Sequence, residues 1–254
     1  MQTAIPAATL IVFRRGAHPV ELLFVERAGS MTFAAGAIVF PGGRVDPGDR
    51  MMAAQGFPHL DLDDAAARIA AIRETIEEAG VVIGLRTAGG GAINAEMARR
   101  LQAHLHEGQV FADILGAHQL EIMPEALQPF ARWRPNFSER RIFDARFYLA
   151  ELPRGAPMAL VDATENVRLF WASAQQVLDD ARAGLVKIIF PTRRNLERLA
   201  QFADFETARA DAQHYAPDLI TPWVEDRDGA PHLCIPEDRG YPICAEPMVD
   251  VLRG

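Results

Sequence analysis

The distribution of apolar and polar residues along the chain predicts the strands of a sheet. Residues 9–14 and 20–27 are rich in β-branched and aromatic side chains, and Gly16 and Pro19 between them predict a hairpin. Shorter apolar runs bounded by turn-forming residues indicate further strands. These lie at residues 37–40, 81–85, 118–123, 130–133, 142–152 and 167–172.

Apolar residues that recur every three to four positions predict helices. The clearest helix begins after Asp61 or Asp63, either of which is a good N-cap, and ends at Gly80, which suits the left-handed position after a last helical turn. Residues 44–62 are expected to form a loop, because prolines and glycines interrupt them. The expected helices are 63–79, 94–106, 110–115, 173–183 and 191–202.

The pattern changes after Asp204. Residues 205–254 combine one helix with short strands that are separated by prolines and glycines. The chain length suits one decorated domain. We therefore expect one domain over residues 1–204, with an insertion at about 50–62 and a helical segment at about 93–116. The remaining residues are expected to form a C-terminal extension that packs on this domain.

Composition narrows the functional classes. The 254 residues include 34 acidic and 26 basic side chains, and the net charge of −8 argues against a nucleic-acid partner. A small anionic substrate is compatible, because a bound cation reverses the local charge. The chain has no recognisable signal peptide and no apolar run of the ~20 residues that cross a bilayer, so we expect a cytoplasmic protein without membrane contact. Cys234 and Cys244 are expected to be reduced thiols, with a disulfide as the alternative.

Three glutamates share one face of the helix that ends at Gly80. At about 100° per residue, Glu74, Glu77 and Glu78 fall within an arc of about 100° that is centred opposite an apolar stripe. Because these like charges repel one another, a positively charged partner is expected nearby, and Arg73 neutralises part of the negative charge. Because Mg²⁺ prefers oxygen ligands, this face is a candidate metal site. A solvated acidic face is the alternative.

The sequence around these glutamates resembles the Nudix box. The string Arg73-Glu74-Thr75-Ile76-Glu77-Glu78-Ala79-Gly80-Val81 is similar to the second half of that motif, with Thr75 at an apolar position. Gly43 corresponds to the first glycine, and Asp49 stands where the family has glutamate. Residues 50–72 form a longer spacer than the usual one. This expanded box, together with residues 33–46 and 140–148, resembles the coenzyme A diphosphatase subfamily.

The resemblance implies a fold and an activity. The fold is an α/β (α+β) architecture, a Nudix-type α/β/α sandwich with a mixed, twisted sheet. The activity is hydrolysis of the diphosphate bond of a small nucleotide-like molecule, with coenzyme A or acyl-CoA as the favoured substrate and Mg²⁺ or Mn²⁺ as the cofactor. Glu74, Glu77 and Glu78 are the implied metal ligands. Glu74 is also a candidate base, and Arg73 is expected to orient either Glu74 or the loop through charge-assisted hydrogen bonds.

Residues outside the metal-ligand set complete the candidate site. Glu165 precedes the strand expected at 167–172 and resembles a loop glutamate that many Nudix enzymes direct at the metals, so it is a candidate base or ligand. An exposed loop acid is the alternative. Guanidinium groups match phosphate bidentately, whereas surface ion pairs are the alternative for each arginine. The expected substrate contacts are Gly42, Gly43, Arg44, Arg27 and Arg146.

Two rival functions stay open. A non-catalytic Nudix-fold module would bind a nucleotide as a sensor, but retention of Glu74, Glu77 and Glu78 favours an enzyme. An unrelated protein with an acidic helix would lack the glycine bend before the helix and Gly80 after it. A homodimer is compatible with the sequence.

Overall fold

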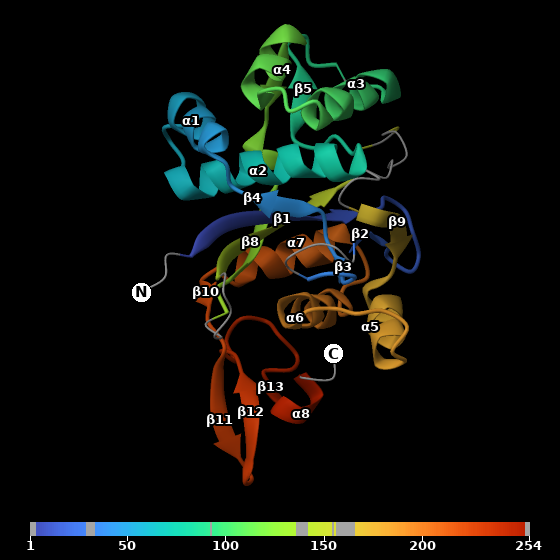
Figure 1. The fold of residues 1–254 in the computed structure, drawn as a ribbon, viewed down its shortest axis with the longest axis vertical. Helices are drawn as coiled ribbons and strands as arrows, with labels where there is room; N and C mark the ends of the chain where they lie inside the picture. The colour runs from blue at the N-terminus through green and yellow to red at the C-terminus, as the bar shows by residue number, and fades with distance from the viewer. Residues whose placement is uncertain are drawn as a thin grey trace.

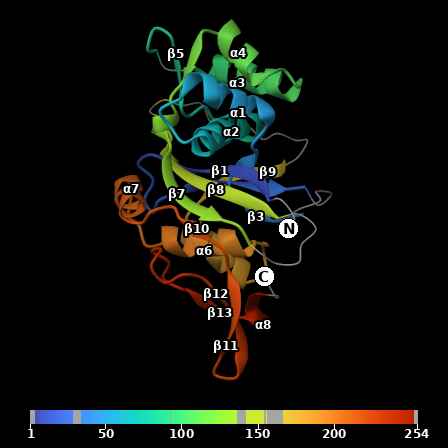
Figure 2. The ribbon, with the colours of Figure 1, turned by 90° about the vertical axis from the view of Figure 1, so that its left-hand side faces the viewer.

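The computed structural model describes residues 4–28, 34–91, 93–135, 142–153, 155 and 166–251. A mixed sheet lies between two layers of helices, and both views show the separation (Figure 1, Figure 2). One layer contains α1 (Pro47–Gly56), α2 (Leu62–Ala79), α3 (Ala95–His106) and α4 (Phe111–Ala117). The other contains α5 (Ala174–Arg182), α6 (Phe190–Leu199) and α7 (Phe205–His214). This arrangement confirms the expected α/β/α sandwich.

The central sheet has the order β10-β7-β8-β1-β2-β3, with β4 paired to β1 and β9 paired to β2. Its strands are β1 (Ile5–Phe13), β2 (Leu22–Arg27), β3 (Ile38–Val39), β4 (Gly42–Arg44), β7 (Gln128–Trp133), β8 (Phe143–Glu151), β9 (Asn166–Ala172) and β10 (Leu219–Ile220). The sheet is mixed, because β1 runs parallel to β8 and β10 runs parallel to β7, while the other pairs are antiparallel. A small separate ladder joins β5 (Leu85–Thr87) to β6 (Leu120–Ile122).

Alternation along β1 divides the interior into two apolar clusters. Leu10 and Val12 pack with α2, α3 and α4, whereas Ile11 and Phe13 pack with α5, α6 and α7. Successive side chains of a strand point to opposite faces, so one buried strand contributes to both clusters. Burial on both faces explains why this strand is an almost continuous apolar run.

Local signals define α2 as expected. The Asp61 side chain accepts a hydrogen bond from the Asp64 backbone N–H, and Gly80 adopts the left-handed conformation after the last turn. Ile69, Ile72 and the other residues of the apolar stripe are buried. The helix is more enclosed than its amphipathic pattern indicates, because Thr75 and Glu78, which lie outside this stripe, are buried as well.

The loop expected over residues 44–62 is wrong, because most of it forms α1. Pro47 occupies the first turn, where a missing N–H is harmless, and the N-cap Asp46 forms a reciprocal capping box with Asp49 in that turn. Two other expectations also need correction. Gly42 and Gly43 belong to β4 instead of a turn, and the strand expected at 81–85 begins only at Leu85.

The last part of the chain continues the central sheet and then leaves it. β10 adds to the sheet edge, and α7 covers the face that also holds α6. β11 (Trp223–Arg227), β12 (Ala230–Cys234), β13 (Ala245–Pro247), the 3₁₀ turn η1 (Pro124–Ala126) and α8 (Met248–Val251) complete the described elements. β11, β12 and β13 form a small sheet that extends beyond α6 (Figure 2).

Two simple expectations concern chemistry and membranes. Cys234 and Cys244 are both free thiols, as expected. Among the described residues, no helix is both long enough and apolar enough to cross a bilayer.

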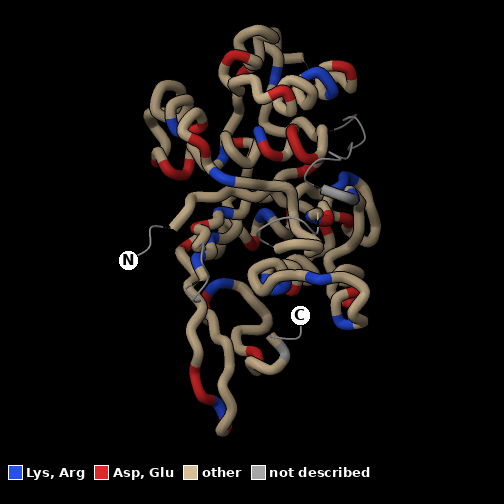
Figure 3. The backbone as a smooth tube through the Cα atoms, viewed as in Figure 1, with Lys and Arg blue, Asp and Glu red and all other residues tan. Residues whose placement is uncertain are grey.

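Acidic and basic residues are interspersed over the chain, and α2 carries both signs (Figure 3).

Candidate active site

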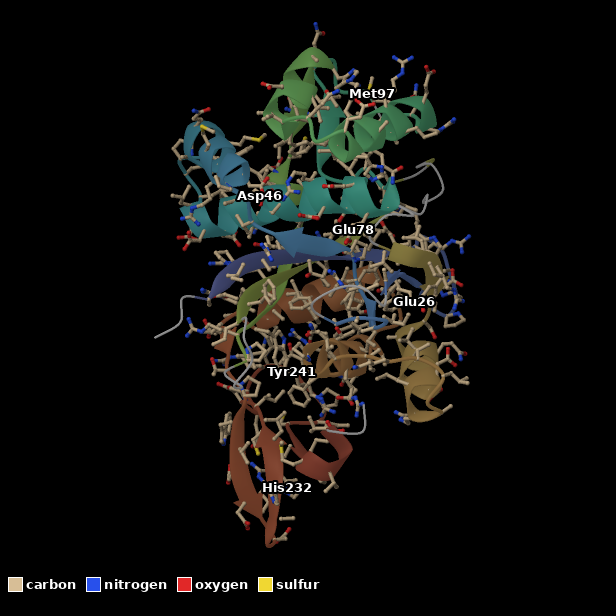
Figure 4. The ribbon with its side chains drawn as sticks, viewed as in Figure 1. Glu26, Asp46, Glu78, Met97, His232 and Tyr241 are labelled. Atoms are coloured by element: carbon tan, nitrogen blue, oxygen red, sulfur yellow. The ribbon has the colours of Figure 1, made fainter. Side chains whose placement is uncertain are left out.

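Two consecutive glycines bring the backbone of β4 against the glutamates of α2. The Gly42 N–H donates a hydrogen bond of 2.9 Å to Glu78 Oε2. A Cβ on Gly43 would lie 2.4 Å from the Glu74 carboxyl carbon, far inside van der Waals contact. Figure 4 labels Glu78 where α2 meets β4. Glycine is therefore needed at this junction to let a backbone segment lie directly on two carboxylates.

Arg73 connects the glutamates to the start of α1. Its Nε and Nη2 donate to the two carboxylate oxygens of Asp49, at 3.1 and 3.0 Å, and its Nη1 donates to Glu74 Oε1 at 2.9 Å. The Asp49 side chain is only 2% exposed. A further Nη2 bond to the Arg44 carbonyl ties down the segment after β4. The aspartate at the family's outer glutamate position thus holds the arginine in a fixed, bidentate geometry.

Burial changes the acid–base properties of this cluster. Burial raises the pKa of Glu74 to about 7, and the charge of Glu77 adds to the rise, while Arg73 opposes it. For Arg73, burial alone would lower the pKa, but the hydrogen bond to Asp49 and the charges of Glu74 and Asp49 outweigh it and raise the pKa further above its ordinary value. Arg73 is therefore a permanent cation, and Glu74 can bind or release a proton near neutral pH.

A cavity of about 1190 Å³ opens over this cluster. Glu74, Glu77 and Glu78 line it together with Gly42 and Gly43, so the glutamates face a shared space next to the glycine bend. The remaining wall is largely apolar. It includes Met51, Met52, Val110, Phe111, Trp133, Phe143, Phe147 and Pro191. A charged floor within apolar walls suits a substrate that carries both phosphate and organic groups.

The side chains of this floor fit a hard divalent cation by their chemistry. Three carboxylates beside an open cavity are the oxygen donors that Mg²⁺ and Mn²⁺ prefer. Over the part of the chain that the structure describes, however, no three acidic, histidine or cysteine side chains are arranged to enclose an ion. Instead, Glu78 accepts from the Gly42 N–H, and Glu74 and Glu77 pair with Arg73. A cation at this floor would therefore require these contacts to rearrange.

The other residues expected at the site divide into two groups. Arg27 and Arg44 line the cavity with the glycines. Arg146 does not, because its neighbours Ala145 and Phe147 face the cavity and alternation turns Arg146 to the opposite side of β8. There it pairs with Asp64 at 3.5 Å. The expectation that Arg146 contacts the substrate is therefore wrong, because this side chain does not line the cavity.

Some expectations lie outside the described residues. These are Glu165, the candidate base or ligand, and Arg140 and Arg141, which belong to the string that resembles the subfamily. Glu165 therefore stays a prediction.

Three residues near the glutamates were not expected at the site. Asp46, labelled at the start of α1 in Figure 4, lies 3.6 Å from Arg73 and lines the cavity. Gln102 and His106 of α3 both contact the Glu77 backbone carbonyl. The spacing of Gln102 and His106 places them on one helix face, and Gln102 interrupts the apolar side of that helix. This polar interruption is a signal that the sequence contains.

Comparison with known proteins places the chain in a family. The family described as NUDT19 Nudix domain matches residues 54–199, which is more than half of the chain and includes the RExxEExG string. A solved Nudix hydrolase from Alicyclobacillus acidocaldarius is 30% identical, with a TM-score of 0.74, over 83% of this chain and 97% of that chain. The chain therefore belongs to the Nudix hydrolase family, and it is a pyrophosphohydrolase.

Other solved Nudix proteins are more distant. The Nudix domain of Shewanella oneidensis NrtR, solved with ADP ribose, is 12% identical over 73% of this chain and 86% of that chain, with a TM-score of 0.41. A Caenorhabditis elegans Ap4A hydrolase is 15% identical over 82% of this chain and 93% of that chain, with a TM-score of 0.38. The family acts on small nucleotide-like molecules, and these distant structures do not indicate which of them this chain takes as its substrate.

Proposed function

We propose that this enzyme hydrolyses the diphosphate bond of a nucleoside diphosphate linked to another group, with Mg²⁺ or Mn²⁺ as cofactor. One observation supports this most directly. Glu74, Glu77 and Glu78 line a single cavity against the Gly42-Gly43 segment, so acidic groups and an accessible backbone face the same space. A diphosphate is an anion, and carboxylates alone would repel it. A divalent cation resolves this conflict because it attracts both.

In this proposal the chain's own groups divide the work. Glu77 and Glu78 would hold the cation, with Glu74 as a further ligand or as the base that takes a proton from the attacking water. The bound cation would lower the pKa of water and neutralise charge on the phosphates. Arg73 orients Glu74 and remains charged throughout. Glu165 is the alternative base, and Arg27 and Arg44 are the proposed phosphate contacts.

For the substrate we propose coenzyme A or an acyl derivative. The family match to the NUDT19 Nudix domain and the expanded box favour this class. The cavity of about 1190 Å³ exceeds the roughly 300–1000 Å³ of a typical small-molecule pocket, and its walls carry methionine and aromatic side chains. A substrate with a nucleotide at one end and a long organic group at the other suits such a space.

The deciding experiment measures hydrolysis of coenzyme A, acyl-CoA, ADP-ribose, NADH and dinucleoside polyphosphates, with and without Mg²⁺. We expect 3′,5′-ADP among the products from coenzyme A, and no turnover in chelator. Glu77→Gln should lower kcat by about 100-fold or more, because it removes a ligand of the cation that would neutralise charge in the transition state. Turnover by Glu77→Gln within a few-fold of wild type would remove the proposed catalytic assignment.

The alternative, a nucleotide sensor, makes a different prediction. It would bind members of the same panel tightly in the presence of Mg²⁺ and release no product. A cytoplasmic location and a homodimer stay predictions of the sequence, to be checked by fractionation and by light scattering of the purified protein.

A further inference from the structure

The Glu77 backbone carbonyl receives two hydrogen bonds from α3. Gln102 Nε2 donates to it at 3.0 Å, and His106 Nε2 lies 2.8 Å from it. A carbonyl oxygen only accepts, so the His106 Nε2 carries the proton in this contact. Two side chains from a segment outside the family motif therefore bind the backbone of a residue inside the motif.

The position of this carbonyl gives the contact its importance. α2 ends at Ala79, and the last four carbonyls of a helix have no partner within the helix. The Ile76 carbonyl accepts from the Gly80 N–H. The Glu77 carbonyl is the next one along, and α3 satisfies it. The same last turn carries the side chains of Glu77 and Glu78, so any fraying of the backbone there displaces two carboxylates together.

The packing of α3 against the end of α2 is close. A Cβ on Gly80 would lie 2.9 Å from Gln102 Oε1, so glycine at this position also makes room for the Gln102 amide. The Gln102 side chain is buried among apolar residues of α3, whereas His106 is exposed and lines the cavity. Burial of one donor fixes its direction, because a buried amide without an acceptor is costly.

We propose that Gln102 and His106 are positioning residues that hold the last turn of α2, and thereby set the cation affinity of Glu77 and Glu78. This inference rests on the proposed function. It gives α3, which belongs to the helical segment at about 93–116, a role in positioning the residues that would bind the cation. Residues that orient ligands without touching the ion commonly change metal affinity by about 10–100-fold.

The test measures Mn²⁺ binding to the full chain without substrate, from the electron paramagnetic resonance signal of free Mn²⁺. The variants are Gln102→Met, His106→Leu and the double variant, which remove the donors and keep much of the side-chain volume. We expect the double variant to bind Mn²⁺ about 10-fold more weakly than wild type. His106→Gln should restore most of the affinity of His106→Leu, because its amide retains an N–H donor.

A purely structural role of α3 gives a different pattern. It would lower the melting temperature of the double variant and leave the Mn²⁺ affinity of the folded protein unchanged. Arg99→Met is the matched control, because Arg99 is exposed on the same helix and its Nε contacts only its own helix at Ala95, among the bonds that the structure shows. His106→Leu alone keeps the test valid if Gln102→Met fails to fold.

The outcomes separate this inference from the function it rests on. The positioning role is supported if Arg99→Met binds Mn²⁺ as tightly as wild type and His106→Leu binds it more weakly. Equal Mn²⁺ affinity in wild type and in the folded donor variants would overturn it, while the proposed function would stand. Absence of Mn²⁺ binding and of diphosphate hydrolysis in wild type would overturn both.

Discussion

Replacement of Gly43 by alanine should separate activity from stability. The added Cβ would lie 2.4 Å from the Glu74 carboxyl carbon and from Oε1, whereas ordinary contact begins at 3.4 Å. The Glu74 carboxylate must therefore move by about 1 Å. This group is the end of a flexible side chain, so it can rotate away at little cost to the fold. Its productive position next to Arg73 is lost in the process.

The size of the effect follows from that displacement. A misplacement of about 1 Å in a reacting group costs roughly 100-fold in rate. We therefore expect kcat/KM of Gly43→Ala to fall about 100-fold, equivalent to ~2.7 kcal/mol of transition-state stabilisation. The unfolding free energy should change by less than about 1 kcal/mol. Activity is measured as product release from the best substrate of the panel, and stability by urea unfolding.

Two other glycines serve as controls. A Cβ on Gly42 would lie 2.4 Å from the Ala8 carbonyl oxygen and 2.7 Å from the Thr9 Cα, which are backbone atoms that cannot rotate away. Gly42→Ala should therefore lose about 1–3 kcal/mol of stability. Gly56→Ala, at the end of α1 and outside the cavity lining, meets no described atom within 4 Å and should leave both properties unchanged. Full activity of Gly43→Ala with unchanged stability would refute the assigned closeness of Gly43 to Glu74.

Three further predictions concern the buried polar groups. Arg73→Lys keeps the charge but loses the bidentate contact with Asp49, so we expect urea unfolding to show a loss of about 2 kcal/mol, and an unchanged midpoint would contradict this. Tyr241→Phe removes the oxygen that accepts from Trp133 Nε1 at 3.1 Å, so calorimetry should show a loss of about 1 kcal/mol. Burial raises the pKa of Glu197 in the folded protein to about 7, whereas the pKa in the unfolded chain is about 4.3. The contribution of Glu197 to stability is therefore fully present below about pH 4.3 and is lost as the pH rises through about 7. Urea denaturation at a series of pH values should show that the unfolding free energy of Glu197→Gln falls less between pH 5 and 8 than that of wild type. Parallel curves of unfolding free energy against pH would argue against the raised pKa.

The errors in the sequence-based predictions have different causes. Pro47 and Gly48 look like helix breakers, but a proline in the first turn needs no N–H partner, and α1 gains stability by packing on α2. Gly42 and Gly43 look like a turn, but pairing with Ala8 and Thr9 makes them a strand. The proline and capping box of α1 are local signals that the sequence contains, whereas β4 depends on pairing with residues far away in the sequence, which a local pattern does not contain.

The candidate site divides in the same way. The sequence places Arg146 in a strand but does not say which of its faces meets the cavity, and the structure turns it toward Asp64. It places Gln102 and His106 on one helix face but does not say which backbone they reach. Asp49 was recognised by its spacing from Gly43, whereas its bidentate contact with Arg73 depends on how α1 folds back on α2.

The sequence by itself determined what local interactions control. The capping of α2 by Asp61, its end at Gly80 and the grouping of three glutamates on one face all follow from helix geometry and neighbouring residues. Only the tertiary structure decided what those glutamates face. Packing of β4, α1 and α3 around α2 requires long-range contacts, and these contacts convert an acidic helix face that would otherwise be solvated into the floor of a cavity.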